Sequence, residues 1–335
     1  MAQQVPSVAV IMRTRDRPLL LDRAVADVGA QTWTDWRLVV VNDGGVAADV
    51  EEVIRQQGSA LAGRVIVIHN DVSRGVGAAC NQGIKASDSA FIAIHDDDDT
   101  WHPTFLQRTV AHLDTTTDAA VAVRTEIIWE YVQGQEVIEH GREIFPPDVH
   151  SFSLFEMLRY NRTIPISVLY RRAIHDEVGY LREDLPAVED WEFYLRLALT
   201  THSLGFLDGE PLAFWHQRRA AQDALANSVI ARDSDHRAMD LLVREEALRA
   251  YARQNGLGGL LYTTKYLERE IDQLHERMQR HEEEVVRRLA RLEAAVSDAS
   301  LVSLALRLYR RLKARLRHVR PADPDPARSS AENPA

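Results

Sequence analysis

Four consecutive carboxylates are the most chemically distinctive feature of the sequence. This acidic run, residues 96–99, follows His95 and the apolar segment 91–94. Neighbouring carboxylates repel one another, and a divalent cation bound between them relieves that repulsion. Oxygen ligands favour Mg²⁺ or Mn²⁺, above all where the ion also bridges a diphosphate. The position after a buried segment predicts a metal site, although an isolated acidic run is more often a solvated loop.

A second acidic pair, Glu189 and Asp190, stands beside Trp191 and Phe193 at the predicted start of a helix. Aromatic neighbours desolvate a carboxylate, which raises its pKa and helps it to accept a proton near neutral pH. The helix dipole also favours acidic residues in a first turn, so the pair can instead mark only a helix start. His216 follows the apolar stretch 211–215, where a lone histidine is usually a packing residue.

Short apolar runs bounded by polar turns must position these groups, and we expect them to be buried strands. The expected strands are residues 8–12, 38–41, 65–68 and 91–94. Segments with helical spacing lie between and after them, namely residues 18–30, 46–57, 76–87 and 103–113. Alternating strands and helices predict an α/β fold with a doubly wound, mostly parallel sheet. Further elements are expected near 164–170 and 204–207 as strands.

Polar residues follow each of these strands. Thr14 and Asp16 follow the first, Asp43 the second, Arg74 the third and Asp96 the fourth. Parallel sheets bind ligands at the carboxyl ends of their strands, so these residues predict a nucleotide site. Side chains alternate along an extended strand, which would place Asp96 on one face together with Asp98 and would point Asp97 and Asp99 the other way.

Taken in order, these segments resemble glycosyltransferase family 2, whose members have the GT-A fold. The resemblance runs from Val8 to about Ser228. It rests on six motifs, VAVIMRTRDRP, QTWTDWRLVVVNDGG, SRGVGAACNQGI, FIAIHDDDDTWHP, VGYLREDLPAVEDWEFYLRLA and FWHQRR. No single motif is specific, but the set in this order and spacing is. The resemblance implies an inverting, Mn²⁺- or Mg²⁺-dependent transfer of a sugar from a nucleotide-sugar donor to an acceptor hydroxyl.

The resemblance also implies a role for the residues around the donor. Asp43 would contact the nucleotide base, Thr14 and Asp16 would line the same pocket, and Arg74 belongs to the same site. Asp96 would face the ribose or diphosphate and share the metal with Asp98. Because His95 and Asp97 depart from the usual pattern, the division of roles among Asp97, Asp98 and Asp99 stays open.

On the acceptor side, the resemblance implies that Asp190 is the general base and that Glu189 orients acceptor hydroxyls. His216 would approach the diphosphate or the metal, and Arg218 or Arg219 would neutralise phosphate. UDP is the expected nucleotide, with GDP and dTDP also compatible with these residues. The expected acceptor is a saccharide or a lipid-linked saccharide, in the synthesis of a surface polysaccharide or glycolipid.

Two other functions are compatible with parts of the pattern. A sugar-nucleotide pyrophosphorylase would carry a glycine-rich basic loop after its first strand, but residues 12–18 contain no glycine. A non-catalytic scaffold could keep the fold and use its helical tail for assembly. The acidic run, the pair Glu189 and Asp190, and His216 together favour an enzyme. A phosphoacceptor domain would need an acidic pocket after the first strand, which Asp16 alone does not supply.

The composition limits the partners. A formal net charge of −10 argues against a surface that binds nucleic acid, because phosphate neutralisation needs clustered Lys and Arg. The single cysteine, Cys80, cannot form an internal disulfide. No signal-peptide pattern and no apolar run near the ~20 residues of a membrane span is present. We therefore expect a cytoplasmic protein, which can also bind peripherally to the inner face of a membrane.

Residues 236–320 predict almost continuous helix, with a break at 255–259. Residues 265–296 carry coiled-coil spacing with a slip near Val285, which predicts either self-association or packing on the same chain. Residues 301–320 hold seven Lys or Arg and no Asp or Glu. Such a basic amphipathic helix predicts an anionic membrane surface or a protein docking site. The expected divisions are a catalytic domain (1–235), a helical extension (236–300), this basic helix (301–320) and a disordered tail (321–335).

Overall fold

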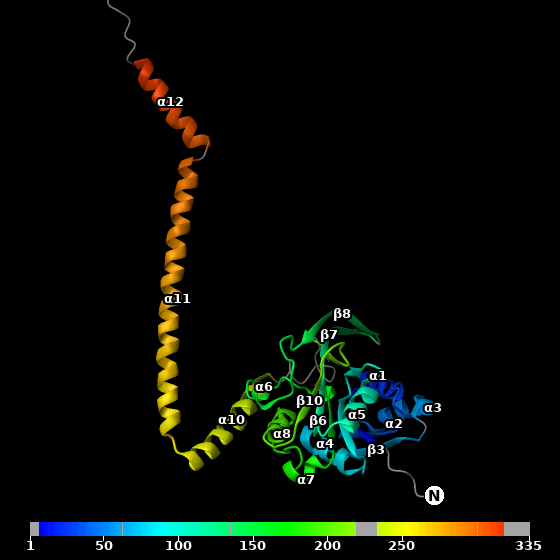
Figure 1. Cartoon of the computed structure of the whole chain (residues 1–335). Coiled ribbons are helices and arrows are strands. Elements are labelled where there is room, and N and C mark those ends of the chain that lie inside the picture. Colours follow the sequence, from blue (N-terminus) through cyan, green and yellow to red (C-terminus); the bar gives the residue numbers. More distant parts are fainter. Residues whose placement is uncertain (1–6, 62, 135, 219–232, 300, 318–335) are drawn as a thin grey trace, which may run out of the picture. The chain divides into compact units, whose positions relative to one another are not determined.

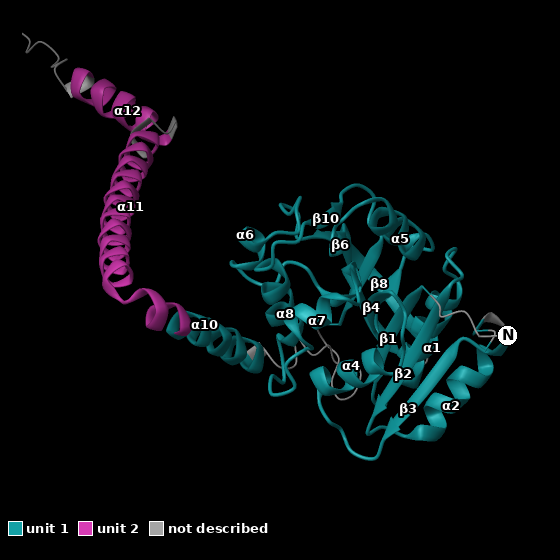
Figure 2. Ribbon diagram, turned by 60° about the horizontal axis from the view of Figure 1, so that its bottom comes forward, with its two compact units in different colours: residues 1–249 teal, residues 250–335 magenta. Residues whose placement is uncertain are grey.

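The computed structural model describes residues 7–61, 63–134, 136–218, 233–299 and 301–317. The chain divides into two compact units, Met1–Arg249 and Ala250–Ala335, coloured separately in Figure 2. This division falls within helix α10 (Asp233–Asn255), after the boundary expected at residue 235. The expected tail 321–335 lies outside the described residues, as does the end of segment 301–320.

A seven-stranded sheet forms the centre of the first unit (Figure 1). In spatial order its strands are β10 (Leu204–Leu207), β6 (Ala120–Val123), β9 (Val168–Arg171), β4 (Phe91–Asp96), β1 (Val8–Thr14), β2 (Trp36–Asp43) and β3 (Val65–Asn70). Strands β4, β1, β2 and β3 are parallel, and β9 runs antiparallel between β4 and β6. The predicted, mostly parallel sheet is confirmed.

Helices cover both faces of this sheet. They are α1 (Pro18–Gly29), α2 (Ala47–Gln56), α3 (Gly58–Leu61), α4 (Val76–Lys85), α5 (Phe105–Thr115), α6 (Leu154–Met157), α7 (Ile174–Val178) and α8 (Glu189–Ala198). Successive strand residues point to opposite faces. Val10 accordingly packs in one core with α1, α2 and α5, while its neighbour Ile11 packs in a second core with α4 and α8. The doubly wound arrangement is confirmed.

A smaller four-stranded sheet lies beside the acidic run and was not predicted. Its spatial order is β5 (Thr100–Trp101), β11 (Ala213–Gln217), β7 (Thr125–Gln133) and β8 (Glu136–Phe145). Strands β7 and β8 form a long antiparallel pair whose register shifts between Trp129 and Glu130. The extra residue at this shift is on β8, and Glu130 of β7 is buried although it is charged. This sheet brings Glu130 and His216 to the end of β4.

Long helices complete the chain. The first part of α10 belongs to the first unit, where Met239 and Val243 pack in its core and Arg244 donates to the carbonyls of Leu158 and Arg159 at 2.8 Å. The second unit contains α11 (Gly258–Ala299) and α12 (Leu301–Arg317). The predicted break is confirmed at Gly256, whose φ of +78° suits a helix C-cap. No helix in the described ranges combines the length and apolar character that crossing a membrane requires.

Candidate active site

A cleft of about 550 Å³ opens at the carboxyl ends of β1, β2 and β4. Seven of the residues singled out from the sequence line it: Thr14, Asp16, Asp43, Asp96, Asp98, Glu189 and Asp190. Arg74 and His216 are not among its lining residues. The cleft therefore joins the acidic run at the end of β4 to the acidic pair at the start of α8.

The acidic run does not continue the strand. Strand β4 ends at Asp96, and the chain turns so that the Asp99 N–H donates to the Asp96 carbonyl at 3.3 Å. All four carboxylates line the cleft. The expected alternation, with Asp96 and Asp98 on one face and Asp97 and Asp99 on the other, is wrong because period-two alternation holds only for extended backbone.

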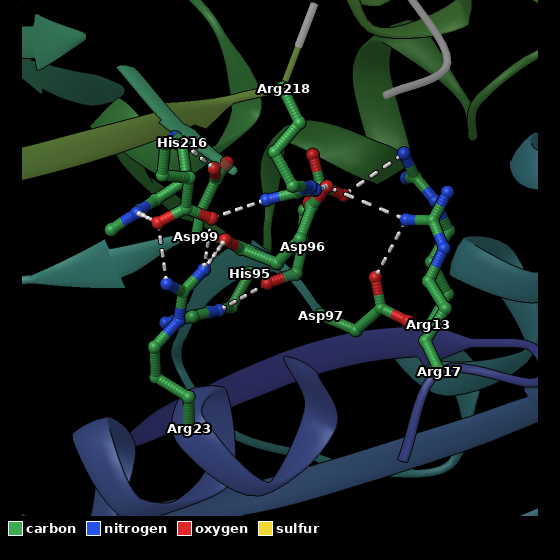
Figure 3. A network of polar contacts seen from close by, with 11 residues as sticks. Arg13, Arg17, Arg23, His95, Asp96, Asp97, Asp99, His216 and Arg218 are labelled. Carbon is green, nitrogen blue, oxygen red and sulfur yellow. Dashed lines mark hydrogen bonds and ion pairs between the residues drawn. The ribbon is translucent and has the colours of Figure 1, made fainter. Parts of the chain in front are cut away.

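Arginines from distant segments neutralise part of the run (Figure 3). The pairs are Arg13–Asp96 (2.9 Å), Arg17–Asp97 (3.2 Å), Arg17–Asp98 (3.5 Å) and Arg218–Asp98. Arg218 is 1% exposed, so its guanidinium is a buried part of the site. Arg219, the alternative phosphate partner, lies outside the described residues.

The arginines do not compensate all of the negative charge, and the pKa values of two carboxyls in the run are raised. Burial raises the pKa of Asp97 to about 6, where Asp98 adds to the effect of burial and Arg17 opposes it. Burial, reinforced by Asp98 and Asp96, also raises the pKa of Asp99 well above its usual range. One buried oxygen of Asp97, Oδ2, has no hydrogen-bond partner. A cation at this end of the cleft would stabilise both carboxylates.

A divalent ion fits these residues only if substrate phosphates complete its set of ligands. Among the described residues, no three His, Cys, Asp or Glu side chains converge as ligands of one ion. Mg²⁺ and similar ions are commonly held by one or two carboxylates together with substrate phosphates. Asp96 and Asp98 can supply such a partial set, so the site fits an ion that arrives with a diphosphate.

Glu130 is a buried carboxylate behind the acidic run that binds several side chains, and it was not predicted from the sequence. It is 3% exposed. Its carboxylate accepts hydrogen bonds from Arg23 at 2.8 and 3.1 Å, from Arg218 at 2.5 Å and from His216 at 2.7 Å. Burial raises the pKa of Glu130, but the bonds from His216 and Arg23 outweigh burial and lower it to about 2. Glu130 is therefore ionised and holds Arg218 against Asp98.

His216 lies beside Glu130, behind the acidic run. Its Nδ1 lies 2.7 Å from Glu130 and its Nε2 lies 2.8 Å from the Thr100 hydroxyl. Because an ionised carboxylate only accepts hydrogen bonds, Nδ1 carries a proton. Burial lowers the pKa of His216, so Nε2 is neutral and accepts from Thr100. The backbone N–H of His216 donates to Asp99 at 2.9 Å.

Glu189 and Asp190 project into the cleft from a strained turn. Val188, the residue before α8, has a φ of +59°, which is unusual for a β-branched residue. Burial, together with the neighbouring Asp190, raises the pKa of Glu189 to about 7. Burial also raises the pKa of Asp190, while Asn161 donates to its Oδ2 at 2.7 Å. Both carboxyls therefore have raised affinity for a proton.

Asp43 organises the loop between β3 and α4. It accepts hydrogen bonds from the Asn70 amide (2.9 Å), the Ser73 hydroxyl (2.7 Å) and the backbone N–H groups of Arg74 (2.8 Å) and Gly75 (3.1 Å). Burial raises the pKa of Asp43, but these bonds together lower it below its usual value. Arg74 thus contributes through its backbone.

Thr14 and Asp16 line the cleft at the end of β1. Thr14 is buried at the end of β1, and Asp16 follows with a φ of +55°. Asp16 Oδ1 accepts a hydrogen bond from the backbone N–H of Val46 at 3.1 Å, which ties the β1 loop to the β2 loop. Asp16 and Val188 are the two non-glycine residues with positive φ in the described chain, and both line the cleft.

The sequence places this site in a known family. The family model described as Glycosyl transferase family 2 matches residues 9–179, about half of the chain. The chain belongs to glycosyltransferase family 2. The predicted family and the GT-A-like α/β fold are confirmed. The matched region contains the first three strand-end loops and the acidic run, whereas Glu189, Asp190 and His216 lie beyond it.

Several relatives are similar to this chain over more than half of its length. The "Uncharacterized glycosyltransferase YwdF" of Bacillus subtilis is 26% identical, over 57% of this chain and 68% of its own. The "Putative colanic acid biosynthesis glycosyl transferase WcaA" of Escherichia coli is 27% identical, over 58% of this chain and 67% of its own. The structure of S. aureus TarS 1-349 in complex with UDP-GlcNAc superposes with a TM-score of 0.53 at 18% identity, covering 75% of each chain. At that identity the superposition shows a shared fold.

Proposed function

We propose that this glycosyltransferase moves a sugar from a nucleotide-sugar donor to an acceptor hydroxyl with inversion at the anomeric carbon. One observation carries the proposal: a single cleft holds the acidic run at one end and the pair Glu189 and Asp190 at the other. Direct displacement needs a base on one side of the anomeric carbon and stabilisation of the leaving diphosphate on the other. The acidic pair can supply the base, and the acidic run would hold a cation that stabilises the leaving diphosphate.

The donor is proposed to lie along β1, β2 and the loop before α4. Asp43 and Asp16 would contact the nucleotide base. Thr14 would line the wall beside the base, and the loop that carries Arg74, which Asp43 holds in place, would line the same pocket. Arg13 and Arg17 already face carboxylates in the cleft, and a diphosphate offers the same kind of oxygen partners to a guanidinium. We propose UDP as the nucleotide, in keeping with the UDP-GlcNAc held by the TarS structure.

Asp96 and Asp98 are the proposed protein ligands of Mn²⁺ or Mg²⁺. The ion would supply positive charge at the departing diphosphate. His216 enters this set only if its ring leaves Thr100 and Glu130, whose contacts occupy both ring nitrogens. Metal affinity of His216→Ala, measured by calorimetry, tests that role: an unchanged affinity makes His216 a positioning residue for Asp99 and Glu130.

Asp190 is the proposed general base, and Glu189 the group that orients the acceptor. Asp190 is the less buried of the two and is fixed by Asn161. Removal of a general base commonly costs 10²–10⁴-fold in rate. Asp190→Asn should therefore lose about that factor in kcat while its affinity for the nucleotide is kept. Near wild-type turnover in Asp190→Asn would assign the base to Glu189 instead.

The acceptor is proposed to be a saccharide or lipid-linked saccharide, in surface polysaccharide or glycolipid synthesis. Helix α12 supports a membrane setting, because it is basic and exposes Leu304, Leu308 and Leu312, each at least half exposed. Flotation with vesicles of anionic lipid tests this. Substitution of Arg310 and Arg311 by Glu should abolish flotation, and flotation equal to wild type would leave α12 without a membrane role.

Calorimetric titration with UDP, GDP and dTDP, each with and without Mn²⁺, tests the donor site as a whole. We expect one nucleotide to bind, and to bind at least tenfold more tightly with Mn²⁺. No binding of any nucleotide by protein with native circular dichroism would favour the scaffold alternative.

A further inference from the structure

We propose that α11 forms a parallel, in-register coiled coil with a second copy of this chain. Helix α11 is continuous over 42 residues, about 63 Å at 1.5 Å per residue. One stripe of apolar side chains runs along it. Its members are Leu267, Ile271, Leu274, Met278, Val285, Leu289, Leu292 and Val296, all between 40% and 70% exposed. A continuous row of exposed large apolar residues marks an interaction surface.

The spacing of the stripe identifies the kind of surface. With His281 included, successive members from Leu267 to Val296 are 4, 3, 4, 3, 4, 4, 3 and 4 residues apart. Alternating spacings of three and four form the heptad seam of a coiled coil. The repeated four at Val285 is a stutter, because α11 runs through it without a break. The slip seen in the sequence is therefore part of a continuous seam.

The stutter favours one arrangement of two copies. A stutter locally unwinds the coiled coil, so two helices pack best where their stutters coincide. Parallel, in-register helices bring both Val285 positions together. In a parallel pair that is out of register, the stutter of one helix packs against regular heptads of the other. The same mismatch arises in an antiparallel pair, unless that pair is centred on Val285. In register, the polar core residue His281 also meets its own copy, and such pairing of polar core residues fixes register.

The charges flanking the seam complement a parallel copy. With Ile271 at position a, Arg277 is at g and Glu282 is at e of the next heptad. In a parallel pair, each g residue faces the e residue five positions further on in the partner helix. Arg277 then faces the Glu282 position of the second copy. Beyond the stutter, where Leu289 takes position a, Arg288 is at g and faces the Glu293 position at e. Glu270 faces His275, and no like charges meet at these positions.

Light scattering on the full chain tests the association. We expect twice the chain mass of 37.9 kDa. Leu274→Asp should weaken the dimer at least tenfold, because it places a charge in the seam. Gln273→Asp is the matched control, since it adds the same charge one residue away on the outer face and should leave the dimer intact. A monomeric wild-type chain, a trimer, or equal effects of the two variants would overturn the proposal.

Disulfide trapping tests the orientation. The native thiol of Cys80 is buried, so it does not compete with an introduced one. Leu267→Cys and Leu292→Cys, made separately, introduce thiols about 38 Å apart along the helix. Both variants should form cross-linked dimers under mild oxidation. An antiparallel pair brings identical residues together at one level only, so cross-linking of one variant alone, or of neither, would contradict the parallel, in-register arrangement.

Discussion

Replacing Glu130 by glutamine should reduce the stability of the first compact unit by about 3 kcal/mol at pH 7. The carboxylate is 3% exposed and binds Arg23, Arg218 and His216. Burial raises its pKa, but His216 and Arg23 outweigh burial and lower it from 4.5 to about 2. At about 1.4 kcal/mol per pKa unit, the ionised form stabilises the fold by about 3 kcal/mol. Loss of one partner from a buried ion pair typically costs a similar amount, about 3–5 kcal/mol.

Urea unfolding followed by tryptophan fluorescence measures this change, since all six tryptophans lie between residues 33 and 215. Glu139→Gln is the matched control. Glu139 lies on the neighbouring strand β8, where it forms an exposed ion pair with Arg142 of the same strand. Its removal should lower the unfolding free energy by less than about 1 kcal/mol. Because the folded pKa is depressed, the contribution of Glu130 is complete above pH ~4.5 and is lost as pH falls toward 2. The difference between wild type and Glu130→Gln should shrink over that range.

Equal unfolding free energies of Glu130→Gln and wild type at pH 7 would refute a stabilising role for the Glu130 carboxylate. An equal loss of unfolding free energy in Glu139→Gln and Glu130→Gln would also refute it, because the two glutamates differ chiefly in burial and in the number of their partners.

Two further predictions follow from buried positions in the same unit. Since burial raises the folded pKa of Glu189 to about 7, folded protein holds a proton that unfolded protein releases between pH 4.5 and 7. The unfolding free energy should therefore fall across that range, and a pH series of urea unfolding should show less of this fall in Glu189→Gln. Gly77→Ala would place a Cβ 2.4 Å from the Arg182 carbonyl oxygen and should cost about 1–3 kcal/mol in the same assay. Gly58→Ala, with no atom within 4 Å of its Cβ, should not destabilise, and a loss there equal to that of Gly77→Ala would refute the steric explanation.

The sequence predicts well which strand-end residues reach the cleft, because local patterns determine their positions. Each apolar run that ends in a polar residue forms one strand, and parallel strands gather those ends at one edge. Thr14, Asp43 and Asp96 reach the cleft for this reason. The strained turn at Val188 was not foreseen, since nothing in the residue type favours a positive φ there.

The layer behind the acidic run could not be predicted, because it depends on pairing between distant segments. Glu130 is the last buried residue of β7, and a charged residue in an alternating strand is normally assigned to solvent. Only the pairing of β7 with β11, which sets Trp129 opposite Gln217, places it against Arg218, 88 positions away.

Charge compensation in the acidic run shows where the chemical argument from sequence was incomplete. A metal ion was expected because adjacent carboxylates repel one another, but Arg13, Arg17 and Arg218 already meet part of that need. The case for a cation therefore rests on what these arginines leave uncompensated, namely the raised pKa values of Asp97 and Asp99. A diphosphate competes for the same guanidinium groups, so its arrival increases the negative charge that must be neutralised. Nucleotide and metal should consequently bind together more tightly than either binds alone.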